Sequence, residues 1–177
     1  MINAAEYGKA LFLLTEEVGS TDTVLAEIDE VSALIGGNDG YARLLDTPAL
    51  PKEERLALID GAFSAYDEYL VNTMKILCEA RSVRVFDKLA LAYHTAYDEA
   101  RGIIRAEAVS AQPMTEEQIS SMQARLSSLT KKTVLITNKV DPSVLGGVRL
   151  SYSGIQLDGT LKTRLEGFKE SLRSVVL

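Results

Sequence analysis

The side chains that most often carry catalysis or metal binding are scarce in this sequence. It holds one cysteine, one histidine and no tryptophan. With Cys78 alone, the chain can form neither an internal disulfide nor a cysteine-based zinc site. His94 has no second histidine or cysteine with which to share a metal, so we interpret both residues as structural. We therefore expect no metal site and no cofactor.

The motifs of common enzymes are missing as well. The sequence has no P-loop, no GxGxxG, no GxSxG and no HExxH, and nothing singles out a pair of carboxylates for acid–base chemistry. No apolar run has the length of a membrane span. The start MINAAEYGKA lacks the pattern of a secretory signal or a transit peptide. We expect a non-enzyme that stays where it is made and does not insert into a membrane.

Positive charge is scarce in the first part of the chain. The net charge of −6 argues against nucleic acid as a partner. Residues 1–100 hold 8 Lys and Arg against 18 Asp and Glu, whereas residues 101–177 hold 11 against 7. An acidic part followed by a basic part indicates two domains that meet different partners, although two merely solvated surfaces would show the same charges.

The first hundred residues have the periodicity of helices joined by short connections. Capping residues and turn residues separate apolar stripes spaced at three and four positions. This pattern predicts a helical bundle over residues 1–101. The expected helices cover residues 3–18, 23–35, 41–45, 51–63, 68–80 and 82–101.

Two of these helices carry more apolar surface than a single buried stripe requires. In the first helix, Tyr7, Leu11, Leu14 and Val18 form one stripe, while Phe12 lies on roughly the opposite side. The helix over 68–80 is likewise apolar on two sides. Either the helices are buried centrally, or one side faces the core and the other takes a partner helix. The pattern alone leaves both interpretations open.

After Gly102 the periodicity changes to that of a small mixed domain, residues 102–177. Alternation predicts strands over 103–111 and 133–140, and a capping box at Thr115 begins a helix between them. We expect the helix to pack on a small sheet through one face. That face is formed by Ile119, Met122, Leu126 and Leu129.

A β-hairpin is expected near the end of this domain. Gly146 and Gly147 mark a sharp turn or a close approach of the backbone. With Ser153 and Gly154 as the turn, Tyr152 faces Ile155 and Leu150 faces Leu157. A final one-faced helix follows, with its apolar stripe at Leu161, Leu165, Phe168 and Leu172. The fold class is therefore α+β: a six-helix bundle followed by a small α/β domain with a β-hairpin.

Three stretches of the sequence are distinctive: VDPSVLGGVRL and IQLDGTLKTRLE near the end, and YGKALF at Tyr7–Phe12. They resemble the delta subunit of F-type ATP synthases, whose mitochondrial counterpart is the oligomycin-sensitivity-conferring protein. In YGKALF, Gly8 replaces the alanine that is usual in the family. The span from Asn72 to Val85 also resembles the family's fifth and sixth helices. There Ala80-Arg81-Ser82 replaces the usual Asn-Gly-Arg turn. The resemblance covers essentially the whole chain.

The resemblance implies a non-catalytic adapter in the peripheral stalk, on the cytoplasmic face of a bacterial membrane. Its helical domain would bind the N-terminal helix of an α subunit between the first and fifth helices. Its C-terminal domain would hold the C-terminal helices of b-type stalk subunits, so that proton-driven rotation is coupled to ATP synthesis. By position, the partner-binding residues implied are Tyr7, Ala10, Leu11, Leu14, Val24, Asn72 and Ile76.

The residues themselves leave two other classes open. One is a helical regulatory module that binds a protein unrelated to ATP synthase. The other is an enzyme without a recognisable motif, which would need carboxylates with shifted pKa values lining a pocket.

Overall fold

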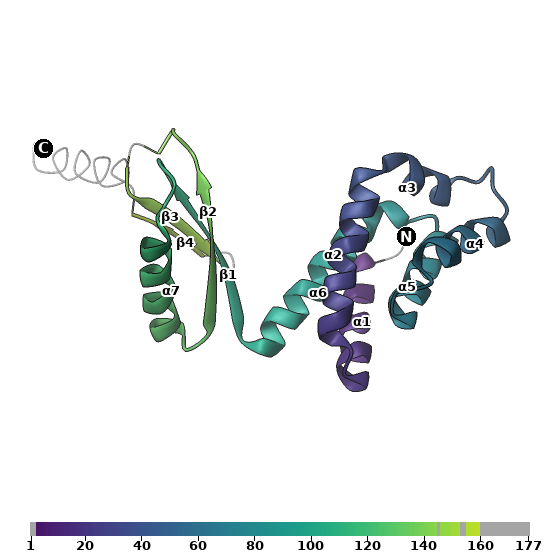
Figure 1. Ribbon diagram of the computed structural model, residues 1–177, viewed down its shortest axis with the longest axis horizontal. Coiled ribbons are helices and arrows are strands. Elements are labelled where there is room, and N and C mark those ends of the chain that lie inside the picture. The colour runs from purple at the N-terminus through teal and green to yellow at the C-terminus, as the bar shows by residue number, and fades with distance from the viewer. Residues whose placement is uncertain (1–2, 145, 153–154, 160–177) are drawn as a thin grey trace, which may run out of the picture. The chain divides into compact units, whose positions relative to one another are not determined.

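The computed structural model describes residues 3–144, 146–152 and 155–159. The chain divides into two compact units, one up to Tyr97 and one from Asp98 onward. The described residues form helices in the first unit and a mixed sheet with a helix in the second (Figure 1). The predicted α+β class is confirmed.

The helical unit consists of elements that pack around one apolar core. Its core includes Leu11, Ile28, Leu77 and Phe86, which come from four different helices and are each at most 1% exposed. The helices among the described residues are α1 (Ala4–Val18), α2 (Thr21–Gly37), α3 (Asp39–Asp46), α4 (Lys52–Phe63), α5 (Glu68–Glu79) and α6 (Phe86–Arg101), with a 3-10 turn over Val83–Val85.

The observed helix boundaries follow the capping chemistry of the sequence. Asp67 accepts a hydrogen bond from the backbone N–H of Tyr69 and so caps α5, as predicted. The second helix begins at Thr21, two residues earlier than expected, and a 3-10 turn precedes α6. The turn after α5 places Arg81 in the left-handed region, with φ of 52°.

Tyr93 links three helices of this unit through its hydroxyl group. The ring is fully buried and packs edge-on against Phe12, with ring centroids 5.7 Å apart. Its hydroxyl lies 2.7 Å from Thr15 Oγ1 and donates to the carbonyl of Thr21 at 3.1 Å. Thus α6 holds the end of α1 and the start of α2 through one polar group that is excluded from water.

Gly8 lets α1 approach α6 unusually closely. A Cβ atom at this position would collide with the carbonyl oxygen of Leu89 and would lie 2.9 Å from the Cβ of Ala92. Backbone atoms cannot move aside as a flexible side chain would. The close contact therefore depends on the glycine.

Replacing Gly8 with alanine is expected to lower the free energy of unfolding by about 1–2 kcal/mol. The collision outweighs the gain of about 1 kcal/mol that alanine gives inside a helix. Gly61→Ala is the matched control, because Gly61 lies in α4 and a Cβ there meets nothing within 4 Å. Urea unfolding followed by circular dichroism should show the first variant less stable than the parent and the second at least as stable. Equal stabilisation by both would contradict the close approach.

The second unit is a sheet with one described helix on it. Its strands are β1 (Ile103–Ser110), β2 (Thr133–Val140), β3 (Val148–Tyr152) and β4 (Ile155–Asp158), and α7 spans Glu116–Thr130. Among the described residues, the strand order is β2-β1-β3-β4. Strands β1 and β2 are parallel and the remaining pairs are antiparallel. The predicted strand–helix–strand unit and hairpin are confirmed.

The hairpin has the predicted register. Tyr152 pairs with Ile155 and Leu150 with Leu157. The predicted turn at Ser153 and Gly154 lies outside the described residues, as does the predicted final helix. Gly146 and Gly147 have φ of 149° and 82°, so the sharp turn expected there is present.

The capping box that begins α7 is confirmed. Of the four residues predicted on the apolar face of this helix, Leu129 was predicted wrongly. Thr115 Oγ1 accepts from Gln118 N, and the Gln118 side chain accepts from Thr115 N. Met122 and Leu126 pack against the sheet, whereas Leu129 is 79% exposed. The partly buried row continues from Leu126 to Thr130, four positions later, and not to Leu129, three positions later.

Candidate functional site

Helix α1 has an inner and an outer apolar side. The inner side includes Leu11 and Phe12, both at most 4% exposed. On the outer side, Leu13, Leu14 and Val18 are 63%, 46% and 58% exposed. Because apolar side chains on one element are normally buried against a neighbour, the outer side is a candidate surface for a partner.

Helix α5 packs against α1 and also has one buried side and one side that is exposed to water. Leu70, Met74 and Leu77 are each at most 1% exposed, while Ile76 is 43% exposed. Asn72, one turn before Ile76, is also exposed. We define the α1–α5 surface by the accessible residues that the sequence predicted on these two helices: Tyr7, Ala10, Leu14, Asn72 and Ile76. Of these, Tyr7 is half-buried and the others are exposed.

Two predicted partner-binding residues lie in the core of the helical unit. Leu11 is 1% exposed and Val24 has no exposed surface, so neither side chain can touch a partner in this conformation. Val24 belongs to the buried stripe of α2 together with Ile28, Val31 and Ile35. We therefore leave both residues out of the α1–α5 surface.

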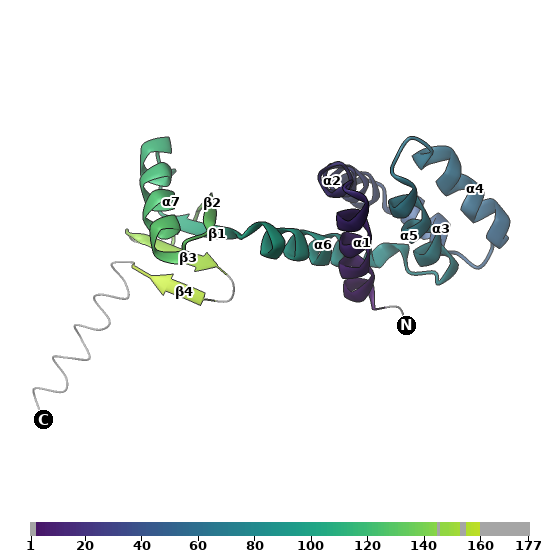
Figure 2. The ribbon, with the colours of Figure 1, turned by 90° about the horizontal axis from the view of Figure 1, so that it is seen from below.

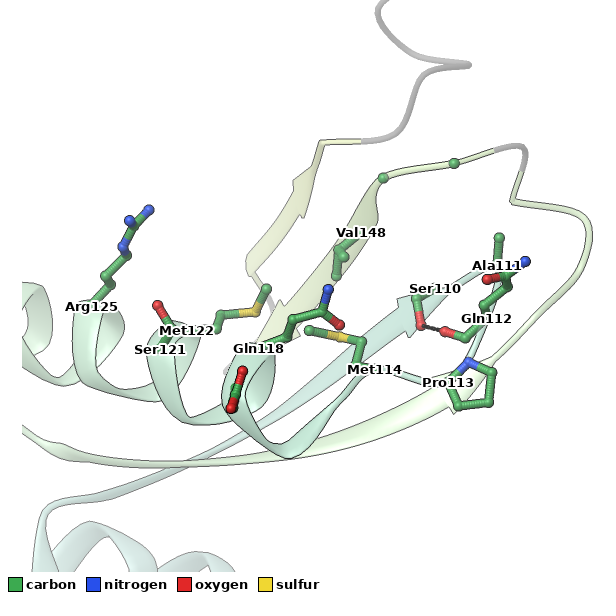
Figure 3. A pocket seen from close by; sticks show the side chains of 13 residues that line it. Ser110, Ala111, Gln112, Pro113, Met114, Gln118, Ser121, Met122, Arg125 and Val148 are labelled. Carbon is green, nitrogen blue, oxygen red and sulfur yellow. Dashed lines mark hydrogen bonds between the residues drawn. The ribbon is translucent and has the colours of Figure 1, made fainter.

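The second unit contains a pocket that the sequence did not reveal. Its volume is about 810 Å³, and it lies between the end of β1, the first turns of α7 and the start of β3. Figure 3 shows Met114, Gln118 and Met122 reaching toward Val148 from the α7 side. Glu117 and Arg125 are charged, and the other residues that line the pocket are uncharged. Met114, just before α7, and Met122, in the middle of α7, hint at an irregular apolar space, because unbranched thioether side chains fill such spaces, but they do not by themselves locate a pocket.

Asn138 on β2 fixes the segment that forms one wall of this pocket. Its Nδ2 donates to the Ala108 carbonyl at 2.9 Å and to Ser110 Oγ at 2.8 Å. Its Oδ1 accepts from the backbone N–H of Met114 at 2.9 Å. Ser110 Oγ in turn donates to the Gln112 carbonyl at 2.7 Å (Figure 3). The wall is therefore held by hydrogen bonds and does not depend on an occupant.

Cys78 and His94, the single cysteine and the single histidine, both have contacts within the fold. Cys78 is buried, and burial raises the pKa of its thiol, although the Arg55 guanidinium partly offsets this. His94 Nε2 lies 2.7 Å from Asp29 Oδ1. Among the described residues, no group of three or more His, Cys, Asp or Glu side chains is arranged to hold a metal ion. None of the described helices has the length and hydropathy that crossing a bilayer requires.

Comparison with known proteins identifies the family. The family model for the ATP synthase delta (OSCP) subunit matches residues 4–172. The chain belongs to this family. It is 34% identical to the ATP synthase subunit delta of Clostridioides difficile (strain 630) over 180 aligned positions, which cover 99% of both chains. It is 35% identical to the ATP synthase subunit delta of a Geobacillus strain, WCH70, with 97% of each chain covered.

The fold is also shared with a solved structure. A chain of the mitochondrial ATP synthase hexamer of Toxoplasma gondii superposes with a TM-score of 0.75 at 16% identity, covering 97% of this chain and 98% of that one. At this identity the likeness establishes the fold alone. The resemblance seen in the Gly146–Gly147 and Tyr7–Phe12 stretches thus extends to nearly the whole chain.

Proposed function

We propose that this chain is the non-catalytic stator adapter of a bacterial F-type ATP synthase. It would join the catalytic head to the b-type peripheral stalk, at the cytoplasmic face of the membrane, and keep the head from turning with the rotor. In this proposal α1–α6 act as one six-helix bundle over residues 1–101, and residues 102–177 form the stalk-binding domain. Family membership and the exposed apolar residues of α1 and α5 support the proposal.

The α1–α5 surface is the proposed binding site for the N-terminal helix of the α subunit. Leu14 and Ile76 are large apolar side chains that remain 46% and 43% exposed on two helices that pack against each other. An amphipathic helix laid along both would remove them from water, at roughly 25 cal/mol for each Å² of apolar surface buried. A joint under torque needs slow dissociation, and apolar burial of this kind slows it.

Ile76→Asp is expected to weaken binding of a synthetic N-terminal peptide from the α subunit by about tenfold or more, because a charge would enter an apolar contact. Tyr7→Asp should act in the same direction. Isothermal titration calorimetry gives the affinities, and circular dichroism shows whether each variant is folded. Leu34→Asp is the matched control, since Leu34 on α2 is 54% exposed and lies outside the α1–α5 surface.

The adapter role as a whole is tested by copurification from the native cell. A tagged chain should carry the head subunits and the b-type subunits with it. Unchanged peptide affinity in both folded variants would contradict the assignment of the surface. A chain that never travels with ATP synthase subunits would contradict the adapter role and favour a helical regulatory module.

A further inference from the structure

The two helices of the α1–α5 surface carry exposed rows with the same order of side chains. Each row begins and ends with a glutamate, eleven positions apart, and has a large apolar residue eight positions after the first. At 3.6 residues per turn these offsets fall within about 80° around the helix, so each row faces one way. The α1 row is Glu6, Ala10, Leu14 and Glu17, and the α5 row is Glu68, Asn72, Ile76 and Glu79. Because α1 and α5 lie side by side (Figure 1 and Figure 2), the rows place glutamates at both ends of one apolar surface.

Three of these four carboxylates have no ionic or hydrogen-bonded partner among the described residues. Within these ranges, no hydrogen bond or ion pair involves the side chain of Glu6, Glu17 or Glu68, and all three are exposed. Glu79 differs, because its carboxylate lies 3.0 Å from Lys52 Nζ of α4. The ends of the two rows therefore keep negative charges that the described part of the fold does not use.

The position of Glu17 is unfavourable for helix α1 itself. The C-terminal end of a helix carries a partial negative charge, so a carboxylate in the last turn is repelled. Helix α1 has no basic residue in its last turn that would offset this repulsion. Helix α5 also ends on a glutamate without a basic residue in its last turn, but there Lys52 of α4 supplies the opposite charge. Helix stability therefore gives no reason for a glutamate at position 17, and its charge is available to a partner.

The basic residues of the two helices do not cancel these charges. Lys9 is the one basic residue of α1, and it lies about 140° around the helix from Leu14, away from the row. Lys75 is the one basic residue of α5, and its ammonium group pairs with Asp60 of α4. The first hundred residues hold 18 Asp and Glu against 8 Lys and Arg. The field at the α1–α5 surface is therefore negative and attracts cationic partners.

We propose that the glutamates of the two rows select the partner of the α1–α5 surface by charge. They favour an amphipathic helix whose apolar stripe has Lys or Arg at both ends, and they repel one with Asp or Glu there. Glutamates eleven positions apart are separated by about 16 Å along the helix, and basic residues at a similar spacing on the partner would meet them. An apolar surface alone accepts any amphipathic helix, whereas opposite charges add specificity and speed association. The inference rests on the proposed function, which makes this surface a helix-binding site, and adds which helix it accepts.

Two synthetic peptides test the selection against the full chain. Both are versions of the N-terminal peptide of the α subunit from the same cell, with Lys at both ends of the apolar stripe in one and Glu in the other. Isothermal titration calorimetry at low salt should show the Lys peptide binding about tenfold more tightly or more, and the ratio should approach one at about 1 M salt. Equal affinities at low salt would overturn the selection but leave the binding surface in place. Binding of neither peptide would overturn the surface as well, and with it this part of the proposed function.

A charge-matched pair of variants assigns the selection to the rows. The first combines the changes at the three unpaired glutamates, Glu6→Gln, Glu17→Gln and Glu68→Gln, and should bind the two peptides with affinities within about threefold of each other. The control removes the same charge at exposed positions outside the surface: Glu16→Gln, Glu53→Gln and Glu54→Gln. It should keep the preference of the parent chain, and circular dichroism shows that both variants are folded. An equal loss of preference in the two variants would assign the effect to net charge and overturn the proposal.

Discussion

Replacing Arg55 with alanine is expected to lower the free energy of unfolding of the helical unit by about 3–5 kcal/mol. Arg55 is only 4% exposed although it is charged. Its Nη1 donates to the carbonyl of Leu45 at 2.9 Å and to that of Cys78 at 2.7 Å. These carbonyls lie in the last turns of α3 and α5, where carbonyl groups have no i+4 partner within the helix. One guanidinium thus joins the ends of two helices to α4.

The loss should be measured by urea unfolding, with three variants compared. Arg55→Met keeps most of the side-chain volume and should cost less than Arg55→Ala, which separates packing from hydrogen bonding. Arg43→Ala is the control, because Arg43 pairs with Asp39 at the surface and such pairs contribute about 0–1 kcal/mol. A loss of the same size for Arg43→Ala and Arg55→Ala would show that the buried hydrogen bonds of Arg55 contribute no more than a surface ion pair.

The second large effect is a loss of stability in strong base that depends on Tyr93. Burial raises the pKa of its phenol from 10 to about 12. The unfolded chain therefore releases this proton near pH 10, while the folded chain retains it to about pH 12. The stabilisation is complete below pH 10 and is lost above it, by roughly 1.4 kcal/mol for each pH unit up to about pH 12.

Tyr93→Phe isolates this contribution. At neutral pH it should cost about 1–2 kcal/mol, since Thr15 and the Thr21 carbonyl lose their buried partner. Between pH 10 and 12 its free energy of unfolding should fall less steeply than that of the parent. The slope should not vanish, because burial also raises the pKa values of Tyr41 and Tyr66. Parallel pH profiles for the two proteins would contradict the assignment to Tyr93.

Local chemistry explains why much of the fold could be predicted from the sequence. Asp67 and Thr115 are caps whose hydrogen bonds involve residues two or three positions away. The hairpin register follows from the apolar alternation together with a two-residue turn, since a slip by one residue would turn Leu150 out of the core. Such features need no knowledge of the tertiary structure.

The errors in the apolar rows of α1 and α7 have one physical source, the choice between spacings of three and four. With 3.6 residues per turn, a row of apolar side chains can continue to either position. In α1 the inner row runs from Leu11 to Thr15, so Leu14 is exposed while Leu11 is buried. In α7 the row runs from Leu126 to Thr130, and Leu129 is exposed. The pocket and the burial of Arg55 could not be predicted, because each depends on segments distant in sequence.

The outer side of α1 has a further consequence for copies of the chain made in excess of their partners. Leu13, Leu14 and Val18 stay in contact with water for as long as nothing covers them. Exposed apolar clusters promote self-association, and they are what chaperones and proteases encounter on incomplete assemblies. A cell that makes too much of this chain would therefore accumulate little of it, and coexpression with the partner helix should raise its soluble yield.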